Sequence, residues 1–407
     1  MSIVCRNLVF AAAAAFAVAG LAPRAGAAES DELRAEVAAL QKRLDQMEAG
    51  QKAQSLPAWV NRISWKSDLR FRNETINLQY APERNRFRIR ARAGLEAKVN
   101  DTIRMEFALA TTEGADPRAS NQTLTGENSR KPVMLDFAYA EWAPTADWKL
   151  TAGRMRIPLI RPGQSTFIDV DVNPEGLAAS WTHGDFLAVA LYNLLEERAA
   201  ADESTLLAGQ FAWRPRLGAG KFSLGAGYSA FQGVRGRSPF HNSATNGNST
   251  TAVIADCVDT VPCLANDYDL LQLFAEWSQP LGGRPLALYA DFSHNTSAEN
   301  GLDTAWTAGI SWGKASEPLS WEAGFAWLDI QKDALYAQFL DSDFGSGVTD
   351  ARGAVLRAGF APARNWVVNL SWFITESNVE VPVTVAGVGS VRARNSRRLQ
   401  LDLNFRF

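Results

Sequence analysis

Cysteine and histidine are scarce in this chain, and neither sign of charge dominates. Its 407 residues include three cysteines and three histidines, with 41 basic residues against 44 acidic ones. This balance leaves no basic footprint for a nucleic acid, so none is expected as a partner. His183, His241 and His294 lie far apart in the sequence, and no ligand cluster surrounds them or the cysteines. We therefore expect no metal and no cofactor.

Long apolar runs are also missing once the N-terminus is set aside. Residues 1–27 are typical of a signal peptide: Arg6 precedes an apolar run from Leu8 to Leu21, and small residues lead to a cut after Ala27 or Ala28. The alternative, an uncleaved anchor, is disfavoured because the run is short. Beyond it no apolar stretch reaches the roughly 18 residues of a membrane-spanning helix. This excludes a helical membrane protein and leaves a periplasmic, secreted or outer-membrane β-barrel protein.

The remaining cysteines and the aromatic content favour the barrel. Cys5 falls within the signal peptide, so Cys257 and Cys263 are left, and in an oxidising compartment we expect them to form a local disulfide. The chain has 13 Trp, 21 Phe and 30 Gly residues. Aromatic girdles at both lipid interfaces are typical of outer-membrane barrels.

Residues 28–56 differ from the rest. Leu33, Val37, Leu40, Leu44 and Met47 are spaced 4-3-4-3 with charged residues between them, which predicts a helix with a coiled-coil seam and then a linker. Two heptads are few. The segment is interpreted as a short trimerising coiled coil, and a solvated amphipathic helix or a periplasmic tether stays open.

From Ile63 onward the pattern alternates with a period of two. In residues 86–99 apolar side chains fall on one face, and arginine, glutamate and lysine on the other, which suits a water-filled lumen. Residues 57–407 are therefore predicted to form an all-β transmembrane barrel of about 16 antiparallel strands. The expected strands are 63–77, 86–99, 102–111, 133–143, 147–157, 177–182, 185–196, 204–215, 220–233, 267–280, 284–296, 303–315, 319–331, 352–362, 365–378 and 393–407.

The connections between these segments alternate in length. Short turns alternate with connections that are mostly longer, notably 112–132, 158–176, 234–266, 331–351 and 379–392. Short periplasmic turns and long outer loops mark bacterial barrels, so both termini are expected in the periplasm. The last strand ends in Phe405 and Phe407 on one face, which resembles the signal read by the barrel assembly machinery.

Several motifs resemble the putative porin family of Gram-negative bacteria. They are Asp68-Leu-Arg-Phe-Arg72, Arg86-Phe-Arg-Ile-Arg-Ala-Arg-Ala-Gly94, Asp116-Pro-Arg118 with Asn121-Gln-Thr123, Lys131-Pro132 with Asp136-Phe-Ala-Tyr139, and Asp171-Val-Asn-Pro-Glu-Gly176. The resemblance covers most of the first half of the chain, and the second half matches only as a pattern. It implies an outer-membrane barrel with a pore and does not imply a substrate.

The candidate site is a pore constriction. If the first and last strands pair, a basic wall forms on the lumen face from Arg70, Arg72, Arg86, Arg88, Arg90, Arg92, Arg104 and Arg398. In general porins the third outer loop folds into the lumen, and here that position carries the acids Asp169, Asp171 and Glu175. Facing arginines repel unless counter-charge screens them, so we expect these acids to oppose the wall. The excess of arginine favours anions weakly.

Catalytic signals are poor. Gly309-Ile-Ser-Trp-Gly313 fits the nucleophile elbow but lies in an alternating strand, not at a strand-to-helix turn. Asp341, Asp343 and Asp350 faintly resemble a calcium loop without its closing glutamate, so an acidic surface loop is expected instead. No catalytic residue is predicted.

The sequence thus predicts an outer-membrane porin that allows passive diffusion of small hydrophilic solutes or ions. The expected partners are outer-membrane lipid, the barrel assembly machinery and two further copies in a homotrimer. The alternatives are a substrate-specific channel, or an occluded structural or adhesive barrel tethered to the cell wall. The occluded barrel is disfavoured because the sequence offers no plug domain.

Overall fold

The computed structural model describes residues 36–44, 60–114, 116–240, 245–251, 253, 257, 262–385 and 389–407, and it describes only the backbone of 164, 378–385 and 389–393. The chain divides into two units, Met1–Asn61 and Arg62–Phe407. In the first unit, residues 36–44 are helical, and Val37, Leu40 and Leu44 are exposed. The predicted signal peptide lies outside the described residues, and the coiled coil stays a prediction.

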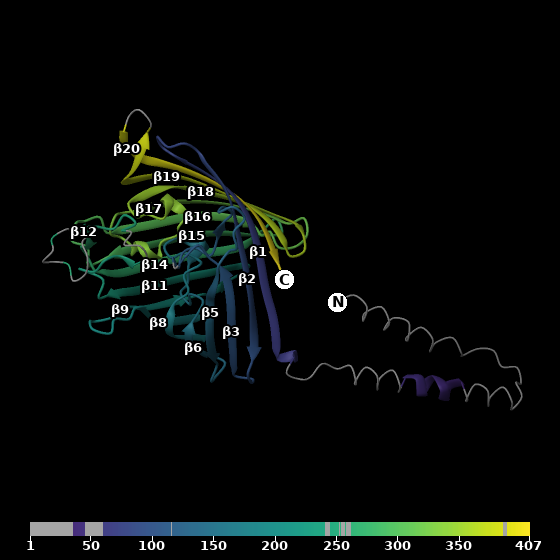
Figure 1. Cartoon of the computed structure of the whole chain (residues 1–407). Helices are drawn as coiled ribbons and strands as arrows, with labels where there is room; N and C mark the ends of the chain where they lie inside the picture. The colour runs from purple at the N-terminus through teal and green to yellow at the C-terminus, as the bar shows by residue number, and fades with distance from the viewer. Residues whose placement is uncertain are drawn as a thin grey trace, which may run out of the picture. The chain divides into compact units, whose positions relative to one another are not determined.

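Arg62–Phe407 contains a closed barrel of sixteen long antiparallel strands, as predicted (Figure 1). Their bounds are β1 (Ile63–Leu78), β2 (Arg84–Lys98), β3 (Ile103–Thr111), β5 (Val133–Trp142), β6 (Trp148–Arg154), β7 (Glu175–His183), β8 (Phe186–Glu196), β9 (Ser204–Trp213), β11 (Gly220–Gln232), β14 (Tyr268–Leu281), β15 (Arg284–Asn295), β16 (Thr304–Gly313), β17 (Trp321–Ile330), β18 (Ala351–Ala363), β19 (Trp366–Val385) and β20 (Gly389–Arg406). Each pairs with its neighbour, and β1 pairs with β20 from Asp68↔Arg406 to Leu78↔Ser396, which closes the ring.

Shorter elements lie in the connections. They are η1 (Val60–Arg62), β4 (Gln122–Thr123), η2 (Pro162–Gln164), β10 (Arg216–Leu217), β12 (Thr250–Thr251), β13 (Cys263–Leu264), η4 (Ala337–Phe339) and η5 (Phe344–Ser346). Cys257 and Cys263 form a disulfide, with their Cα atoms 5.7 Å apart. Among the described residues, no helix is both long and apolar enough to span a membrane.

Successive side chains along each strand point alternately to the outer face and to the inner face of the barrel. In β20, Leu399, Leu401 and Phe405 are exposed, whereas Gln400 and Asp402 are buried. The exposed set continues around the ring with large apolar side chains, so the outer face suits lipid. Phe405 lies on this face, and the backbone N–H of Phe407 donates to Ser67 O. Their role as an assembly signal stays a prediction.

One predicted connection is wrong. Residues 379–392 were expected to be an outer loop, but β19 runs to Val385 and β20 begins at Gly389, with pairing from Val381↔Ala393 to Val385↔Gly389. The reason is the composition of the segment. Valine stands at every second position from Val379 to Val385, and β-branched residues favour extended backbone. The last two strands therefore extend as a hairpin beyond their neighbours.

The lumen is partly filled by connections at the long-loop end of the barrel. We name three of them L2 (residues 112–132), L3 (155–174) and L7 (331–350). L3 and L7 share a buried apolar core with the inner face of the wall that includes Leu206, Phe231 and Tyr268. The sequence predicted no plug domain, and these loops take up part of that space instead.

Candidate constriction and its loops

The predicted arginine wall lies on β1, β2 and β20, facing the lumen. The register sets Arg72 opposite Arg88 and Arg70 opposite Arg90, so like charges meet across two strands. Counter-charge comes from the same strands. Asp402 accepts hydrogen bonds from Arg72 at 2.7 and 2.9 Å, because β20 places it directly opposite Arg72. Bidentate pairs of this kind offset the repulsion that facing arginines would otherwise cause.

Two further carboxylates interleave with the wall. Asp68 accepts from Arg90 at 2.9 Å and from Arg92 at 2.7 Å. Glu74 is fully buried and accepts from Arg86 and from Gln400, with Arg398 3.5 Å away. Most of the wall is thus neutralised from within its own strands.

The remaining predicted arginines have other surroundings. Arg88 donates to Asn121 O at 3.0 Å and to Glu113 at 3.3 Å, both in L2. Arg70 donates to Asn404 at 3.1 Å. Arg104 pairs with Glu141 at 2.8 Å near the short-turn end, so it lies apart from L3. It lines the lumen without joining the constriction.

The three predicted loop acids lie in three different places and have different partners. Asp171 reaches the wall, 3.7 Å from Arg90 and 3.9 Å from Arg92, and accepts from Ser120 Oγ at 2.9 Å. Asp169 instead accepts from the backbone of Ser342 in L7. Glu175 opens β7 on the outer face and pairs with Arg154 at 2.6 Å, so its predicted place opposite the wall is wrong. The strand begins at Glu175, and the alternation turns that side chain away from the lumen.

L7 supplies a second loop acid to the wall, in addition to Asp171 of L3. Asp343 Oδ1 accepts from Arg398 at 2.5 Å and Asp343 Oδ2 accepts from Arg72 at 3.2 Å. This loop was expected to be an acidic surface loop, and that expectation is wrong: Phe344, Gly345 and Thr349 within it are buried. L7 folds inward, and the hydrogen bonds of Asp343 hold it against Arg72 on β1 and Arg398 on β20. We name these contacts the latch.

The other end of L7 is held by aromatic packing. The Tyr336 ring lies 4.7 Å from Phe231, 5.4 Å from Tyr268 and 5.8 Å from Phe339, measured between ring centroids. Phe231 lies on β11 and Tyr268 on β14, far around the ring from β1. L7 therefore crosses the lumen from the β11–β14 wall to the arginine wall.

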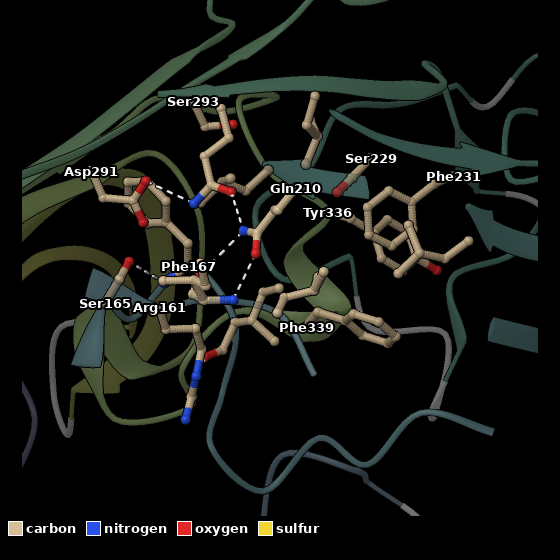
Figure 2. A pocket seen from close by; sticks show the side chains of 17 residues that line it. Arg161, Ser165, Phe167, Gln210, Ser229, Phe231, Asp291, Ser293, Tyr336 and Phe339 are labelled. Carbon is tan, nitrogen blue, oxygen red and sulfur yellow. Dashed lines mark hydrogen bonds between the residues drawn. The ribbon is translucent and has the colours of Figure 1, made fainter. Parts of the chain in front are cut away.

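L3 is anchored on the same wall by polar contacts (Figure 2). Gln210 on β9 accepts from Ile160 N at 2.6 Å and donates to Gln272 Oε1 at 2.7 Å, and Gln272 donates to Asp291 at 2.8 Å. At the tip of L3, Gly163 has φ 55° and packs on Tyr289, where an added Cβ would lie 2.2 Å from the ring. Only glycine fits this contact. The small space in Figure 2 lies between the loops and the wall.

L2 ties the other two loops together. Arg118 donates to Ala337 O and Gly347 O, both at 3.1 Å, so it holds both ends of the L7 turn. Ser120 contacts L3 through Asp171. The three loops form one layer, and its contacts come from residues far apart in the sequence.

The junction of L3 and L7 brings acidic groups together. Burial raises the pKa of Asp169 well above 3.8, and the neighbouring Asp341 and Asp171 raise it further. Burial and the adjacent Asp343 also raise the pKa of Asp341. Burial would raise the pKa of Asp343 as well, but Arg72 and Arg398 outweigh it and hold that pKa far below its usual value. Asp343 therefore stays ionised while Asp169 and Asp341 resist ionisation.

These pKa shifts predict that the loop layer loosens as pH rises. A raised folded-state pKa stabilises the fold fully below the unfolded value, near 3.8, and that contribution is lost as pH rises through the folded value. Asp341→Asn should reduce this loss, because its Oδ1 can still accept from Asp343 N and Phe344 N while the charge beside Asp169 is gone. Each unit of raised pKa corresponds to about 1.4 kcal/mol.

The measurement is the rate of proteolytic cleavage within 331–350 in folded protein. We expect cleavage of the wild-type protein, corrected for protease activity, to be faster at pH 8 than at pH 5, and the variant to show a smaller difference. An equally steep pH dependence in both proteins would contradict the assignment to this carboxylate cluster.

Two cavities mark the space left open beside the arginine wall. The one nearer the long-loop end has about 90 Å³, and Asp136 and Asp171 line it together with Met134 and Arg154, which belong to the outer face of β5 and β6. The one nearer the short-turn end has about 250 Å³, and Lys66, Arg92 and Arg156 line it. Arg92 lies 3.9 Å from Asp171 and 4.0 Å from Asp136, so this ion-pair layer separates the two cavities. We name Arg92, Asp136 and Asp171 the eyelet.

Sequence reasoning missed Asp68, Asp136, Arg156 and Asp343, which complete this arrangement. Asp68 stands within a quoted motif and alternates with apolar neighbours, so its lumen position was available from the pattern. Asp136 also stands within a quoted motif, but the register of β5 shifts between Leu135 and Phe137, and the alternation alone does not report its position. Arg156 lies just past the end of β6, where the pattern stops. In the described part of the chain no metal-binding cluster is found, and Ser311 lies within β16, not at a strand-to-helix turn.

Comparison with known proteins agrees with this architecture. The sequence profile of the family described as "putative porin" matches residues 76–254 and 264–407. The high-pH structure of Pseudomonas putida OprB is 14% identical with a TM-score of 0.54, over 86% of this chain and 95% of that one, and this likeness shows a shared barrel fold.

Two further solved structures are similar at lower TM-score. The loop L8 deletion mutant of OmpT, an outer membrane protein of Vibrio cholerae, is 12% identical with a TM-score of 0.49, over 85% of this chain and 100% of that one. Salmonella typhi OmpF in complex with daunomycin is 9% identical with a TM-score of 0.49, over 85% and 97%. No curated protein sequence matches the chain.

Proposed function

Because this chain belongs to the putative porin family and is a porin of the bacterial outer membrane, we propose that small hydrophilic solutes and ions diffuse passively through its eyelet. The observation that carries the proposal is the pair of cavities that meet at Arg92, Asp136 and Asp171. A basic side opposite an acidic side makes a transverse field, in which polar solutes orient and apolar ones lose ordered water.

The passage favours anions. Along the cavity at the short-turn end, the side chains of Lys66 and Arg156 are 52% and 53% exposed, whereas those of Asp68 and Glu106 are 21% and 8% exposed. The carboxylates are covered by their cationic partners, so a passing ion meets mostly positive groups. Exposed charge of one sign attracts counter-ions into a pore.

The test is conductance of the refolded protein in a planar bilayer, with the reversal potential under a salt gradient. We expect stepwise openings with anion preference, and Arg92→Gln should shift the reversal potential towards cations. A unit charge about 4 Å away is worth about 1 kcal/mol in water, which is a roughly fivefold change in permeability ratio. Arg352→Gln is the matched control, because Arg352 pairs with Glu376 at 3.1 Å on the outer face.

An occluded structural barrel is the second candidate, and the path of L7 across the lumen favours it. Well-folded protein that gives no current would establish that candidate in place of the pore. A substrate-specific channel would conduct weakly and bind one solute tightly. An unchanged reversal potential in Arg92→Gln, with current intact, would remove the eyelet from the proposal.

We also propose that the porin is a homotrimer that contacts lipid through its outer face. The heptad spacing in residues 28–56 supports the trimer. A hollow on the outer face over β5–β9, lined in part by the small side chains of Ala140, Ala152, Ala179 and Ala190, offers an apolar surface for a second copy. Openings that arrive in threes in the same bilayer recordings support the trimer, and independent single openings oppose it.

A further inference from the structure

The cavity of about 250 Å³ at the short-turn side of the eyelet combines cationic and apolar walls. Its cationic side includes Lys66, Arg92 and Arg156, and its apolar side includes Ala108 and Phe137. Ligand pockets typically span about 300–1,000 Å³, so this one suits a small molecule. A simple inorganic anion would gain nothing from the apolar side.

Arg156 is fixed in place by two contacts. Its guanidinium carbon lies 4.1 Å above the centre of the Phe137 ring, and its Nη2 donates to Glu106 Oε1 at 3.0 Å. Tyr139 Oη also donates to Glu106, which orients that carboxylate in turn. A guanidinium stacked on a ring is a pre-oriented planar fork, and its half-exposed edge matches a carboxylate.

Lys66 provides a second cation at the same place. Its ammonium lies 2.5 Å from Glu96 and 3.7 Å from Glu106, so both Lys66 and Arg156 share Glu106 as a partner. About half of each side chain remains exposed. The ion pairs at this place continue through Glu96 and join four cations to three carboxylates, which leaves positive charge to be matched by an incoming anion. The cations are Lys66, Arg104, Lys149 and Arg156, and the carboxylates are Glu96, Glu106 and Glu141.

We propose that Arg156 and Lys66 form a binding subsite for small organic carboxylates, with the carboxylate on the cations and the apolar body against Ala108 and Phe137. This deepens the proposed function, since it names the solute class that the passage selects. Arg156 is a specificity-determining residue, and Glu106 with Phe137 positions it.

The experiment uses benzoate as the probe, with benzamide as its neutral counterpart of the same shape. In a bilayer with chloride salt, benzoate on the short-turn side should reduce the current in a saturable way, and benzamide should not. A hydrogen bond to a charged group contributes about 1.5–3 kcal/mol, so Arg156→Gln should raise the half-blocking concentration by roughly tenfold or more. Arg156→Lys should fall between, because it keeps the charge and loses the fork.

Arg352→Gln, a similarly exposed arginine paired with a glutamate, should block like the wild type. Calorimetric titration of the folded, detergent-solubilised protein with benzoate separates this proposal from the pore. Benzoate binding that Arg156→Gln weakens supports the subsite even when no current flows. Current without benzoate block or binding overturns the subsite and leaves the pore intact. Inorganic phosphate binding as tightly as benzoate overturns the organic carboxylate assignment.

Discussion

Replacing Tyr336 by alanine is expected to free L7 from the barrel wall and to raise the single-channel conductance. The Tyr336 ring is 2% exposed and contacts Phe231, Tyr268 and Phe339. Truncating a buried aromatic side chain costs about 3–5 kcal/mol, because the cavity is only partly refilled. L7 is one local segment, so this loss falls on its docking and leaves the strand pairing of the barrel intact.

The readouts are conductance and protease cleavage within 331–350. Once L7 leaves the lumen, a wider aqueous path remains, and a conductance increase of roughly twofold is expected. Tyr336→Phe is the matched control. Among the described residues the buried Tyr336 hydroxyl has no hydrogen-bond partner, so its removal should be neutral or mildly stabilising. Equal conductance in the alanine and phenylalanine variants would show that L7 does not limit the passage.

Asp343→Asn is expected to release the opposite end of L7. The carboxylate of Asp343 accepts hydrogen bonds from both Arg72 and Arg398. An asparagine side chain has one acceptor oxygen and no charge, so it can replace only one of these two bonds. Hydrogen bonds to charged groups contribute about 1.5–3 kcal/mol each, although Arg72 keeps Asp402 and Arg398 keeps Glu74 nearby. We expect noisier openings and faster cleavage of L7 at neutral pH.

The pH dependence identifies this latch. The folded-state pKa of Asp343 is lowered, so its contribution is present above about 3.8 and is lost only as pH falls below that value. The wild-type latch should therefore hold at pH 5, and the difference between wild type and Asp343→Asn should shrink in strong acid. Asp341→Asn, two residues away, should act in the opposite direction at neutral pH. If Asp343→Asn and Asp341→Asn both made the cleavage of L7 faster at neutral pH, the two carboxylates would not have the separate roles assigned to them.

The strands could be predicted from the sequence because their signal is local. In residues 86–99 every second side chain is apolar, and each lumen position follows from its neighbours. The same alternation placed Arg70, Arg72, Arg88 and Arg90 on one face, as the structure has them. The prediction for Glu175 was wrong because this residue is the first of β7, and the start of the strand decides which way its side chain points. Strand boundaries are the least reliable part of a prediction from sequence.

The inward fold of L7 could not be predicted in the same way. Its latch joins Asp343 to Arg72, 271 residues away, and no local pattern reports such a pair. A partial signal was present: residues 334–340 read Ala-Leu-Tyr-Ala-Gln-Phe-Leu, an apolar run that an exposed loop rarely carries. Weighing that run against the loop assignment would have placed L7 against the wall.

The arginine wall also straddles the seam where the first and last strands meet. Arg72 and Arg70 stand on β1, and their partners Asp402 and Asn404 stand on β20, the strand made last. Until the ring is closed, these guanidinium groups lack their native partners, and buried charge without a partner is costly. Pairing β1 with β20 therefore gives the arginines their partners and completes the backbone hydrogen bonds in the same step. A barrel closed in this register is favoured over one closed with another strand or in a shifted register.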